Sequence, residues 1–281
     1  MNQRTALVTG ASTGIGNTIA HRLARDGWRV YASVRKQDDA DRLIRESGSA
    51  IIPLIFDITD PAGIGAAAKR IQDECGPRGL NGLVNNAGVA IAGPLEFLPI
   101  DELRRQLEVN VTGHVAVTQA LMPSIRRATG RIVFIGSISG RSSLPFMGPY
   151  SASKFALEAI ADSWRLELRP FGMHVAIVEP GVIATPIWAT ATRTGDANIA
   201  RMAPEADSYY GKALAGIRKR ITGGMGGRPP EAVAAAVEHA LNARHPRARY
   251  LVGRDARMRI VMQKLPTRVR DRLIVAAVKR L

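Results

Sequence analysis

The sequence predicts an α/β fold: one doubly wound parallel sheet of about seven strands, helices on both faces, and a basic helical tail. Short apolar runs alternate along the chain with segments of helical periodicity, a pattern typical of parallel sheets with right-handed crossovers. The apolar runs are continuous, as expected for strands that are covered on both faces. A glycine-rich turn directly follows the first run.

The elements follow one another in a simple order. Strands are expected where short runs are rich in apolar and β-branched residues, at 5–9, 29–34, 51–56, 82–85, 131–136, 174–179 and 249–252. Helices are expected between them at 14–25, 38–46, 61–74, 101–127, 149–169 and 230–243. No internal repeat or low-complexity linker interrupts this order, so we expect one domain.

Composition narrows the class of protein. The chain has 281 residues, 46% of them hydrophobic, which is enough for a full core. Cys75 is the only cysteine, which excludes an internal disulfide and fits a reducing compartment. The five histidines are scattered, so no metal site is expected. No signal peptide and no apolar run of membrane-spanning length is found, and we expect a cytoplasmic protein.

The net charge of +15 is concentrated near the C-terminus. From Arg244 onward there are 12 Lys/Arg and 2 Asp/Glu, a net of +10, which leaves +5 for the rest of the chain. The basic character therefore belongs to the tail.

The first strand leads into Thr9-Gly10-Ala11-Ser12-Thr13-Gly14-Ile15-Gly16. Glycines allow a tight turn and a close approach of the backbone to a pyrophosphate, and the following helix N-terminus offers free N–H groups. Glycines also simply make turns, but the position between a strand and a helix favours a nucleotide site.

A second motif is the pair Tyr150 and Lys154, four residues apart, with Ser137 thirteen residues upstream. Pro149 suits the first turn of a helix, and such a helix puts Tyr150 and Lys154 on one face. A neighbouring ammonium lowers the pKa of a phenol from its usual value of about 10. The trio thus fits general acid–base chemistry on a carbonyl or an alcohol, whereas the pair alone also fits a solvated helix face.

These motifs occur in order with Asn85-Asn86-Ala87-Gly88, Asn110 and Pro180-Gly181. Together they resemble the short-chain dehydrogenase/reductase family over roughly residues 4–253, and Val-Tyr-Ala-Ser-Val-Arg at 30–35 is similar to hydroxysteroid and retinol dehydrogenases. The resemblance implies a Rossmann-type catalytic domain at 1–253, a variable lid at 184–227 and a basic amphipathic tail at 254–281.

The resemblance also implies a nicotinamide cofactor. The residues that would hold it are Gly10, Ser12, Thr13, Gly14, Ile15 and Gly16 at the adenosine ribose and pyrophosphate, Asp57 and Ile58 at the adenine, Asn85, Ala87 and Gly88 at the adenine ribose, and Pro180, Gly181, Ile183 and Thr185 at the nicotinamide, with Tyr150 and Lys154 also in contact. The segment 85–88 fits equally well an Asn-rich turn that braces the sheet.

The end of the second strand indicates NADP. Val34 stands where NAD-preferring relatives carry Asp, and Arg35 follows directly. A guanidinium can bind a phosphate through two bonds. Arg35 and Lys36 could instead be a solvated loop pair, so NAD remains the alternative.

The resemblance assigns catalytic roles as well. Tyr150 would be the general acid/base, and Lys154 would bond the nicotinamide ribose and lower the pKa of Tyr150. Ser137 would donate to the substrate oxygen, with Ser139 as the substitute. Asn110 would hold a water that links Lys154 to solvent, or be an ordinary mid-helix Asn.

The lid predicts a lipophilic secondary alcohol, ketone or aldehyde, steroid-like or retinoid-like, because apolar pockets match apolar ligands. Its apolar residues are Pro186, Ile187, Trp188, Met202, Tyr209, Tyr210 and Met225. The alternative is that they only pack the lid onto the core.

In the tail, apolar residues at helical spacing are surrounded by Lys and Arg. Such a helix can lie peripherally on an anionic membrane, or it can dock on the domain or a partner subunit. No nucleic-acid-reading motif is found, so no nucleic-acid partner is expected. The resemblance implies a homodimer or homotetramer.

Two other functions stay open: a nucleotide-binding redox sensor or scaffold without turnover, and an NAD-dependent dehydrogenase of a smaller alcohol. The first would be expected to lack a catalytic group. Asn110, Ser137, Tyr150 and Lys154 are all present, which favours an enzyme.

Overall fold

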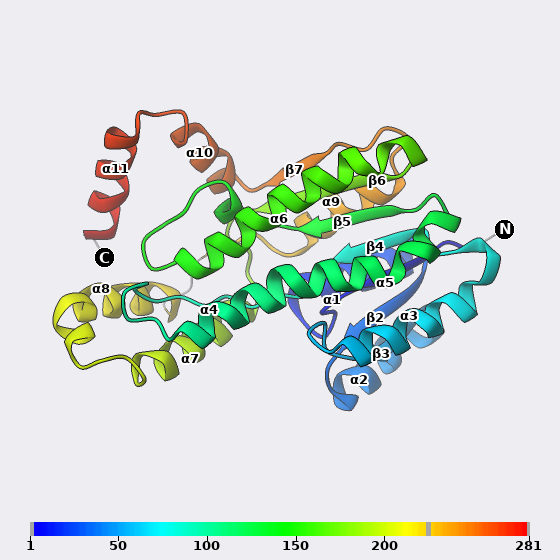
Figure 1. The fold of residues 1–281 in the computed structure, drawn as a ribbon, viewed down its shortest axis with the longest axis horizontal. Helices are drawn as coiled ribbons and strands as arrows, with labels where there is room; N and C mark the ends of the chain where they lie inside the picture. Colours follow the sequence, from blue (N-terminus) through cyan, green and yellow to red (C-terminus); the bar gives the residue numbers. More distant parts are fainter. Residues whose placement is uncertain (1–2, 223–225, 280–281) are drawn as a thin grey trace.

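A computed structural model describes residues 3–222 and 226–279 and contains one parallel sheet of seven strands (Figure 1). The strands are β1 (Thr5–Val8), β2 (Arg29–Val34), β3 (Ile51–Ile55), β4 (Gly82–Asn85), β5 (Arg131–Ile135), β6 (His174–Pro180) and β7 (Arg249–Val252). Their order in the sheet is β3-β2-β1-β4-β5-β6-β7. The predicted doubly wound fold is therefore confirmed, with the change of direction between β1 and β4.

Helices cover both faces of the sheet. The α-helices are α1 (Gly14–Arg25), α2 (Gln37–Ser47), α3 (Pro61–Cys75), α4 (Ile100–Leu107), α5 (Gly113–Arg127), α6 (Gly148–Glu167), α7 (Ile187–Ile199), α8 (Glu205–Thr222), α9 (Glu231–Asn242), α10 (Arg254–Met262) and α11 (Thr267–Lys279). Short 3-10 turns are η1 (Gly48–Ala50), η2 (Gly76–Arg78), η4 (Ile138–Gly140) and η5 (Arg169–Phe171), and η3 (Glu108–Thr112) is a π-helical turn.

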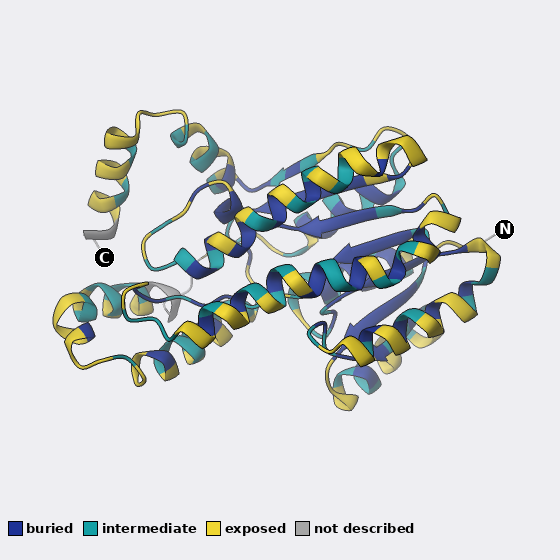
Figure 2. Cartoon of the chain, in the orientation of Figure 1, coloured by how far each residue is buried: buried dark blue, intermediate teal, exposed yellow. Residues whose placement is uncertain are grey.

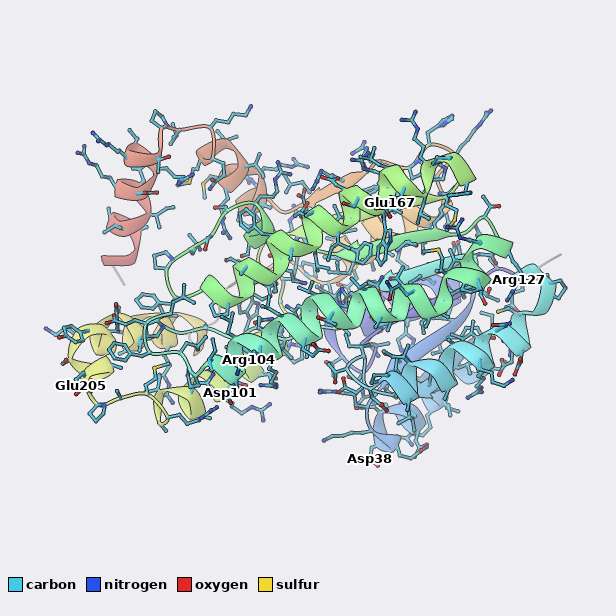
Figure 3. All side chains as sticks on the ribbon, viewed as in Figure 1. Asp38, Asp101, Arg104, Arg127, Glu167 and Glu205 are labelled. Carbon is cyan, nitrogen blue, oxygen red and sulfur yellow. The ribbon has the colours of Figure 1, made fainter. Side chains whose placement is uncertain are left out.

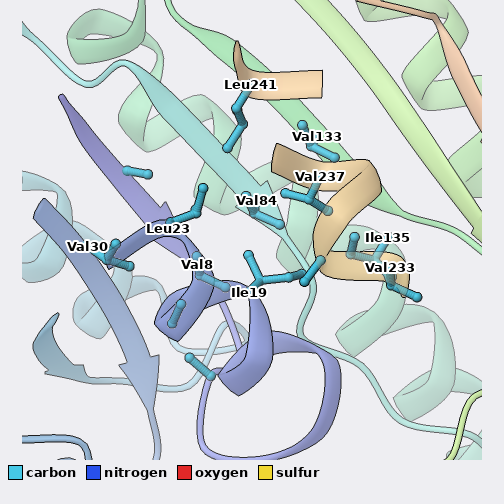
Figure 4. Close-up of a cluster of buried hydrophobic side chains, with 14 of the residues drawn as sticks. Val8, Ile19, Leu23, Val30, Val84, Val133, Ile135, Val233, Val237 and Leu241 are labelled. Atoms are coloured by element: carbon cyan, nitrogen blue, oxygen red, sulfur yellow. The ribbon is translucent and has the colours of Figure 1, made fainter. Parts of the chain in front are cut away.

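Two apolar clusters lie on opposite faces of the sheet. One joins the strands to α1, α2 and α9 and includes Ile19, Leu23 and Val237 (Figure 4). The other joins them to α3, α5 and α6. Side chains alternate between the clusters along β1, where Val8 belongs to the first and Leu7 to the second, and both are fully buried. This two-sided burial explains why the strands are continuous apolar runs.

The helix expected at 101–127 is wrong in one respect, because it is divided. The turn η3, centred on Asn110, separates α4 from α5. Asn110 Oδ1 accepts from Val89 N at 2.9 Å, and Asn110 Nδ2 donates to Val89 O at 3.0 Å. A π-turn inside a long helix is often found at functional sites.

The lid and the tail add helices beyond the sheet. The turn between α7 and α8 is tied to α4 by the ion pair of Arg201 and Asp101 at 2.7 Å. Figure 3 labels Asp101 on α4. Helix α10 docks through the fully buried Ala256, whereas α11 is mostly exposed (Figure 2). No helix in the described part of the chain could cross a membrane.

Candidate active site

A pocket of about 760 Å³ lies at the carboxyl ends of the central strands. The loops after β1, β2, β3, β4, β5 and β6 line it, together with four residues of α4 and η3, the start of α6, four residues of α7 and one residue of α10. Ligands of open parallel sheets bind at this edge, near the point where the strand order reverses. All residues expected at the cofactor and catalytic sites line this pocket except Asn85 and Asn110.

The glycine-rich turn is built for close contact. Gly10 has φ +64°, and a Cβ there would lie 2.7 Å from Ala87 Cα. A Cβ on Gly16 would overlap the Gly10 carbonyl oxygen and Asn86 Nδ2. Thr13, the N-cap of α1, makes no side-chain bond to the first turn, so the N–H groups there stay available. This open helix N-terminus in a cleft fits the pyrophosphate of a dinucleotide.

Two residues that sequence reasoning missed fix the shape of this turn. Thr9 Oγ1 accepts from Asn86 N at 2.9 Å and Ala87 N at 3.0 Å. Ser33 Oγ accepts from Gly10 N at 2.9 Å. Their roles arise from neighbouring strands that are distant in sequence, and no spacing rule reveals them.

Asn85 braces the sheet instead of facing the pocket. Its side chain is fully buried, and Nδ2 donates to Thr118 Oγ1 at 2.8 Å. The adjacent loop is held by His114, whose Nε2 lies 2.6 Å from the Ala87 carbonyl. Burial lowers the pKa of His114 to about 3, so the ring is neutral and donates to Ala87.

Arg35 lies at the adenine end of the pocket. Its side chain is 73% exposed, and Nη1 is 3.9 Å from Asp57 Oδ2. Asp57 is held by Thr59, since its Oδ1 accepts from Thr59 N at 3.0 Å. Val34 is buried in the core, so no carboxylate follows β2 at that position. An exposed guanidinium without a carboxylate at the end of β2 suits a phosphate better than a ribose hydroxyl.

Ser137, Tyr150 and Lys154, the trio predicted to be catalytic, come together in the same pocket. Ser137 follows β5 and its Oγ accepts from Ser139 N at 3.1 Å, which leaves the hydroxyl proton free to donate. Tyr150 and Lys154 lie one turn apart at the start of α6, with Lys154 Nζ 5.7 Å from the centre of the Tyr150 ring. Lys154 is buried and donates to the Ile135 carbonyl at 2.8 Å.

Asn110 supports the trio from outside the pocket. Its Nδ2 donates to Ser153 Oγ at 3.0 Å, and Ser153 Oγ donates to the Tyr150 carbonyl at 2.7 Å. These two hydrogen bonds connect the π-turn η3 to the first turn of α6. The Asn110 side chain therefore has a positioning role in this structure, with Val89 and Ser153 as its partners.

Burial dominates the electrostatics of the trio. It raises the pKa of Tyr150, while the polar interaction with Ser137 and the charge of Arg259 oppose that rise. Burial also lowers the pKa of Lys154 to about 8, against the opposing effect of Glu158. The cation that lowers the pKa of Tyr150 here is thus Arg259 of α10, a residue that the sequence did not single out.

The nicotinamide end is closed by the loop after β6. Asp255 of α10 accepts from Val182 N at 2.7 Å. Trp188 Nε1 donates to the Ile183 carbonyl at 3.0 Å. The loop that would hold the nicotinamide is therefore fastened both to the lid and to the C-terminal helix.

The lid residues divide into two groups. Pro186, Ile187 and Trp188 line the pocket. Tyr209 and Tyr210 pack on Phe97 instead, with ring centres 6.4 and 6.0 Å away. Two aromatic residues of α8 thus pack on the loop after β4, whereas residues at the start of α7 face the pocket. Met225 lies outside the described residues.

The comparison with known families decides the identity. The model of the family described as short chain dehydrogenase matches residues 4–196. The chain belongs to the short-chain dehydrogenase family. The resemblance seen in the sequence is therefore confirmed.

Relatives agree over nearly the whole chain. This short-chain dehydrogenase is 38% identical over 285 residues to the NADPH-dependent 3-dehydrocapnine reductase of Ornithobacterium rhinotracheale, covering 99% of this chain and 98% of the relative. It is 40% identical over 258 residues to retinol dehydrogenase 5 of Homo sapiens, covering 89% and 81%. A solved short chain dehydrogenase from Burkholderia cenocepacia J2315 in complex with NADP has 27% identity and a TM-score of 0.72, covering 95% of each chain.

Proposed function

We propose that the protein is an NADP(H)-dependent oxidoreductase that moves a hydride between the nicotinamide and a lipophilic secondary alcohol, ketone or aldehyde. The observation that carries this proposal is the meeting of Ser137, Tyr150 and Lys154 in one pocket with an open helix N-terminus. The reductase relative, named for NADPH, and the NADP-bound solved structure support it.

Bound NADPH supplies the hydride. Reduction of a carbonyl leaves negative charge on its oxygen, and two hydroxyls can stabilise it there. Ser137, whose Oγ already accepts from Ser139 N, directs its proton to that oxygen. Tyr150 donates its proton as the alkoxide forms. Lys154 is buried beside Tyr150, and the charge of Arg259 favours the phenolate that remains.

NADP is favoured over NAD by the adenine end of the pocket. Arg35 is exposed and Val34 is buried, so a 2′-phosphate finds a cation, whereas a 2′-hydroxyl finds no acceptor on β2. The pyrophosphate would lie at the N-terminus of α1 over Gly14 and Ile15, which line the pocket.

A lipophilic substrate is supported by the side chains that line the pocket around the trio. They include Ile138, Val182, Ile187 and Trp188, together with Val89 and Ile91 from the loop after β4. Apolar walls with a few convergent hydroxyls favour an apolar substrate that is oriented through one oxygen.

The test is NADPH oxidation, against NADH, with steroid, retinoid, quinone and aliphatic carbonyls. The matched variants are Tyr150→Phe and Tyr209→Phe. Tyr209 is 72% exposed on the lid and stacks on Phe97, so its variant controls for loss of a phenol hydroxyl elsewhere. Turnover that is lost by about a hundredfold or more only in Tyr150→Phe supports the proposal.

The alternatives give different results in the same experiment. Tight NADPH binding without turnover of any carbonyl, or of the matching alcohols with NADP⁺, favours the sensor or scaffold. Equal or better rates with NADH and short alcohols favour the NAD-dependent enzyme. Either result would reject the proposed function.

Peripheral membrane contact through the tail is part of the proposal. Val261, Val269 and Leu273 are exposed apolar side chains on α10 and α11, among many basic residues. Co-sedimentation with anionic vesicles should be lost when Val269 and Leu273 are both changed to Glu. Unchanged sedimentation would remove the membrane from the proposal.

The expected homodimer or homotetramer also stays a proposal. Helix α6 carries Phe155 and Leu166, which are 46% and 59% exposed. Exposed apolar side chains on one helix suit a contact between copies of a chain. Sedimentation equilibrium should give two or four subunits, and a monomer at micromolar concentration would contradict this expectation.

A further inference from the structure

Arg259 reaches the catalytic pocket from an unexpected part of the chain. It lies on α10, beyond residues 4–196 that match the family model. Its side chain nevertheless lines the same pocket as Ser137 and Tyr150. Helix α10 thus supplies a charged wall to the part of the pocket where the substrate oxygen would lie.

The guanidinium is held in place by one residue of the opposite loop. Arg259 Nη2 donates to the Ser142 carbonyl, and Arg259 Nε donates to Ser142 Oγ at 3.4 Å. Gln263, one turn later on α10, donates to the same Ser142 Oγ at 2.8 Å. Ser142 is buried and lies five residues after Ser137. Arg259 is therefore fixed on the substrate side of the trio.

Arg259 forms no ion pair with a carboxylate in the described part of the chain. The charge of Asp255, one turn earlier on α10, favours the cationic form of Arg259, but the Asp255 carboxylate itself accepts from Val182 N. Burial lowers the pKa of Arg259, which marks partial loss of water around the charge. Nη1 has no protein partner within the described chain. A cation that has lost part of its water and keeps a free N–H group favours a negatively charged ligand.

The cofactor does not account for this cation. The Gly14 turn that suits a pyrophosphate and the Arg35 side chain that suits a 2′-phosphate belong to the loops after β1 and β2. Arg259 instead bonds the loop after β5, next to Ser137. The charge therefore faces the substrate.

We propose that Arg259 binds an oxyanion of the substrate, so that the substrate is a lipophilic carbonyl compound or alcohol with an acidic group, such as a carboxylate, near its reacting carbon. This assignment rests on the proposed oxidoreductase function. It deepens that function by assigning the apolar walls beside the trio to a chain and the Arg259 guanidinium to an acidic head.

The first arm of the test measures binding without turnover. Decanoate and decan-1-ol are titrated calorimetrically into the NADP⁺-loaded protein, as wild type, Arg259→Gln, Arg259→Lys and Arg257→Gln. Arg257 is exposed on the same helix, so its variant removes an equal charge outside the pocket. We expect decanoate to bind about tenfold or more tightly than the alcohol, a preference lost in Arg259→Gln and kept in Arg257→Gln.

The second arm measures specificity in turnover. The kcat/KM values for 3-oxo-, 4-oxo- and 5-oxodecanoic acids are compared with those for their methyl esters. At least one acid should exceed its ester by about tenfold or more in wild type. The acid-to-ester ratio of kcat/KM should fall to about one in Arg259→Gln. Arg259→Lys retains a cation and should keep part of the preference for the acid.

The two proposals fail in different ways. If no ketone is reduced but decanoate selectivity depends on Arg259, the oxidoreductase function is wrong and the anion site stands. If esters and acids react equally in wild type, or if the preference survives in Arg259→Gln, the anion site is wrong. A variant that changes only the pH profile would make Arg259 a residue that tunes Tyr150 and would overturn the proposal.

Discussion

Substitution of Gly16 by Ala tests how closely α1 approaches the cofactor turn. The added methyl group would overlap the Gly10 carbonyl oxygen and Asn86 Nδ2 and would lie 3.0 Å from the Gly10 carbonyl carbon. Asn86 Nδ2 donates to the carbonyls of Thr9 at 2.8 Å and Gly10 at 3.1 Å. The turn can admit the methyl group only if these bonds lengthen.

The cost follows from this geometry. Overpacking costs about 1–3 kcal/mol, and each weakened hydrogen bond adds about 1 kcal/mol. We therefore expect a loss of about 3–5 kcal/mol in unfolding free energy, or about 5–10 °C in Tm. Because the turn that faces the pyrophosphate moves, the Kd for NADPH should rise by about tenfold or more.

The assay combines thermal unfolding with titration of NADPH fluorescence. Gly65→Ala is the control: Gly65 is exposed within α3, and a Cβ there meets nothing within 4 Å. Ala should stabilise that helix by about 0.5–1 kcal/mol and leave NADPH binding unchanged. If Gly16→Ala unfolds and binds NADPH like wild type, the close approach inferred for this turn is wrong.

Three further predictions concern charge. Arg35→Ala should reduce the NADPH-over-NADH preference in kcat/KM by about tenfold or more, since charged hydrogen bonds contribute about 1.5–3 kcal/mol; an unchanged ratio would reject the phosphate contact. Because burial lowers the pKa of His114 from 6.5 to about 3, the unfolded chain binds a proton that the native state does not. The free energy of unfolding should therefore fall by about 1.4 kcal/mol per pH unit below pH 6.5. Urea unfolding at pH 7, 6 and 5 measures this pH dependence, which in His114→Gln should be smaller by the equivalent of about one proton. The charge of Arg259 acts to lower the pKa of Tyr150. In Arg259→Gln, the rate of alcohol oxidation should therefore begin to rise at a higher pH than in wild type. A shift to lower pH would contradict this electrostatic role.

Much of the fold could be predicted because burial on both faces gives each strand a continuous apolar run. The expected strands at 29–34, 82–85 and 249–252 are found with the same bounds. The break in the helix around Asn110 could not be predicted, because it depends on hydrogen bonds to Val89, whose position is set by the sheet. The lid helices α7 and α8 were not predicted, because apolar and polar residues are mixed in about equal numbers along them.

The candidate site, too, could be predicted only in part from the sequence. Local motifs place Gly10, Ser137, Tyr150 and Lys154, because a turn or a single helix brings each motif together. Contacts between segments that are distant in the sequence could not be predicted from these motifs. Nothing in the sequence around Arg259 distinguishes it from the other basic residues of the tail, and only the docking of α10 on the loop of Ser142 brings it to the pocket.

The fastening of the β6 loop by Asp255 has a consequence for the newly made chain. The sheet strands β1 to β6 and the trio are all translated before α10, and domains generally begin to fold from the N-terminal side during synthesis. A nascent chain can therefore form the nucleotide turn before it has the residue that bonds Val182 N. The wall of the pocket is complete only when Asp255 and Arg259 of α10 have been synthesised, so a chain that ends before α10 would lack both residues.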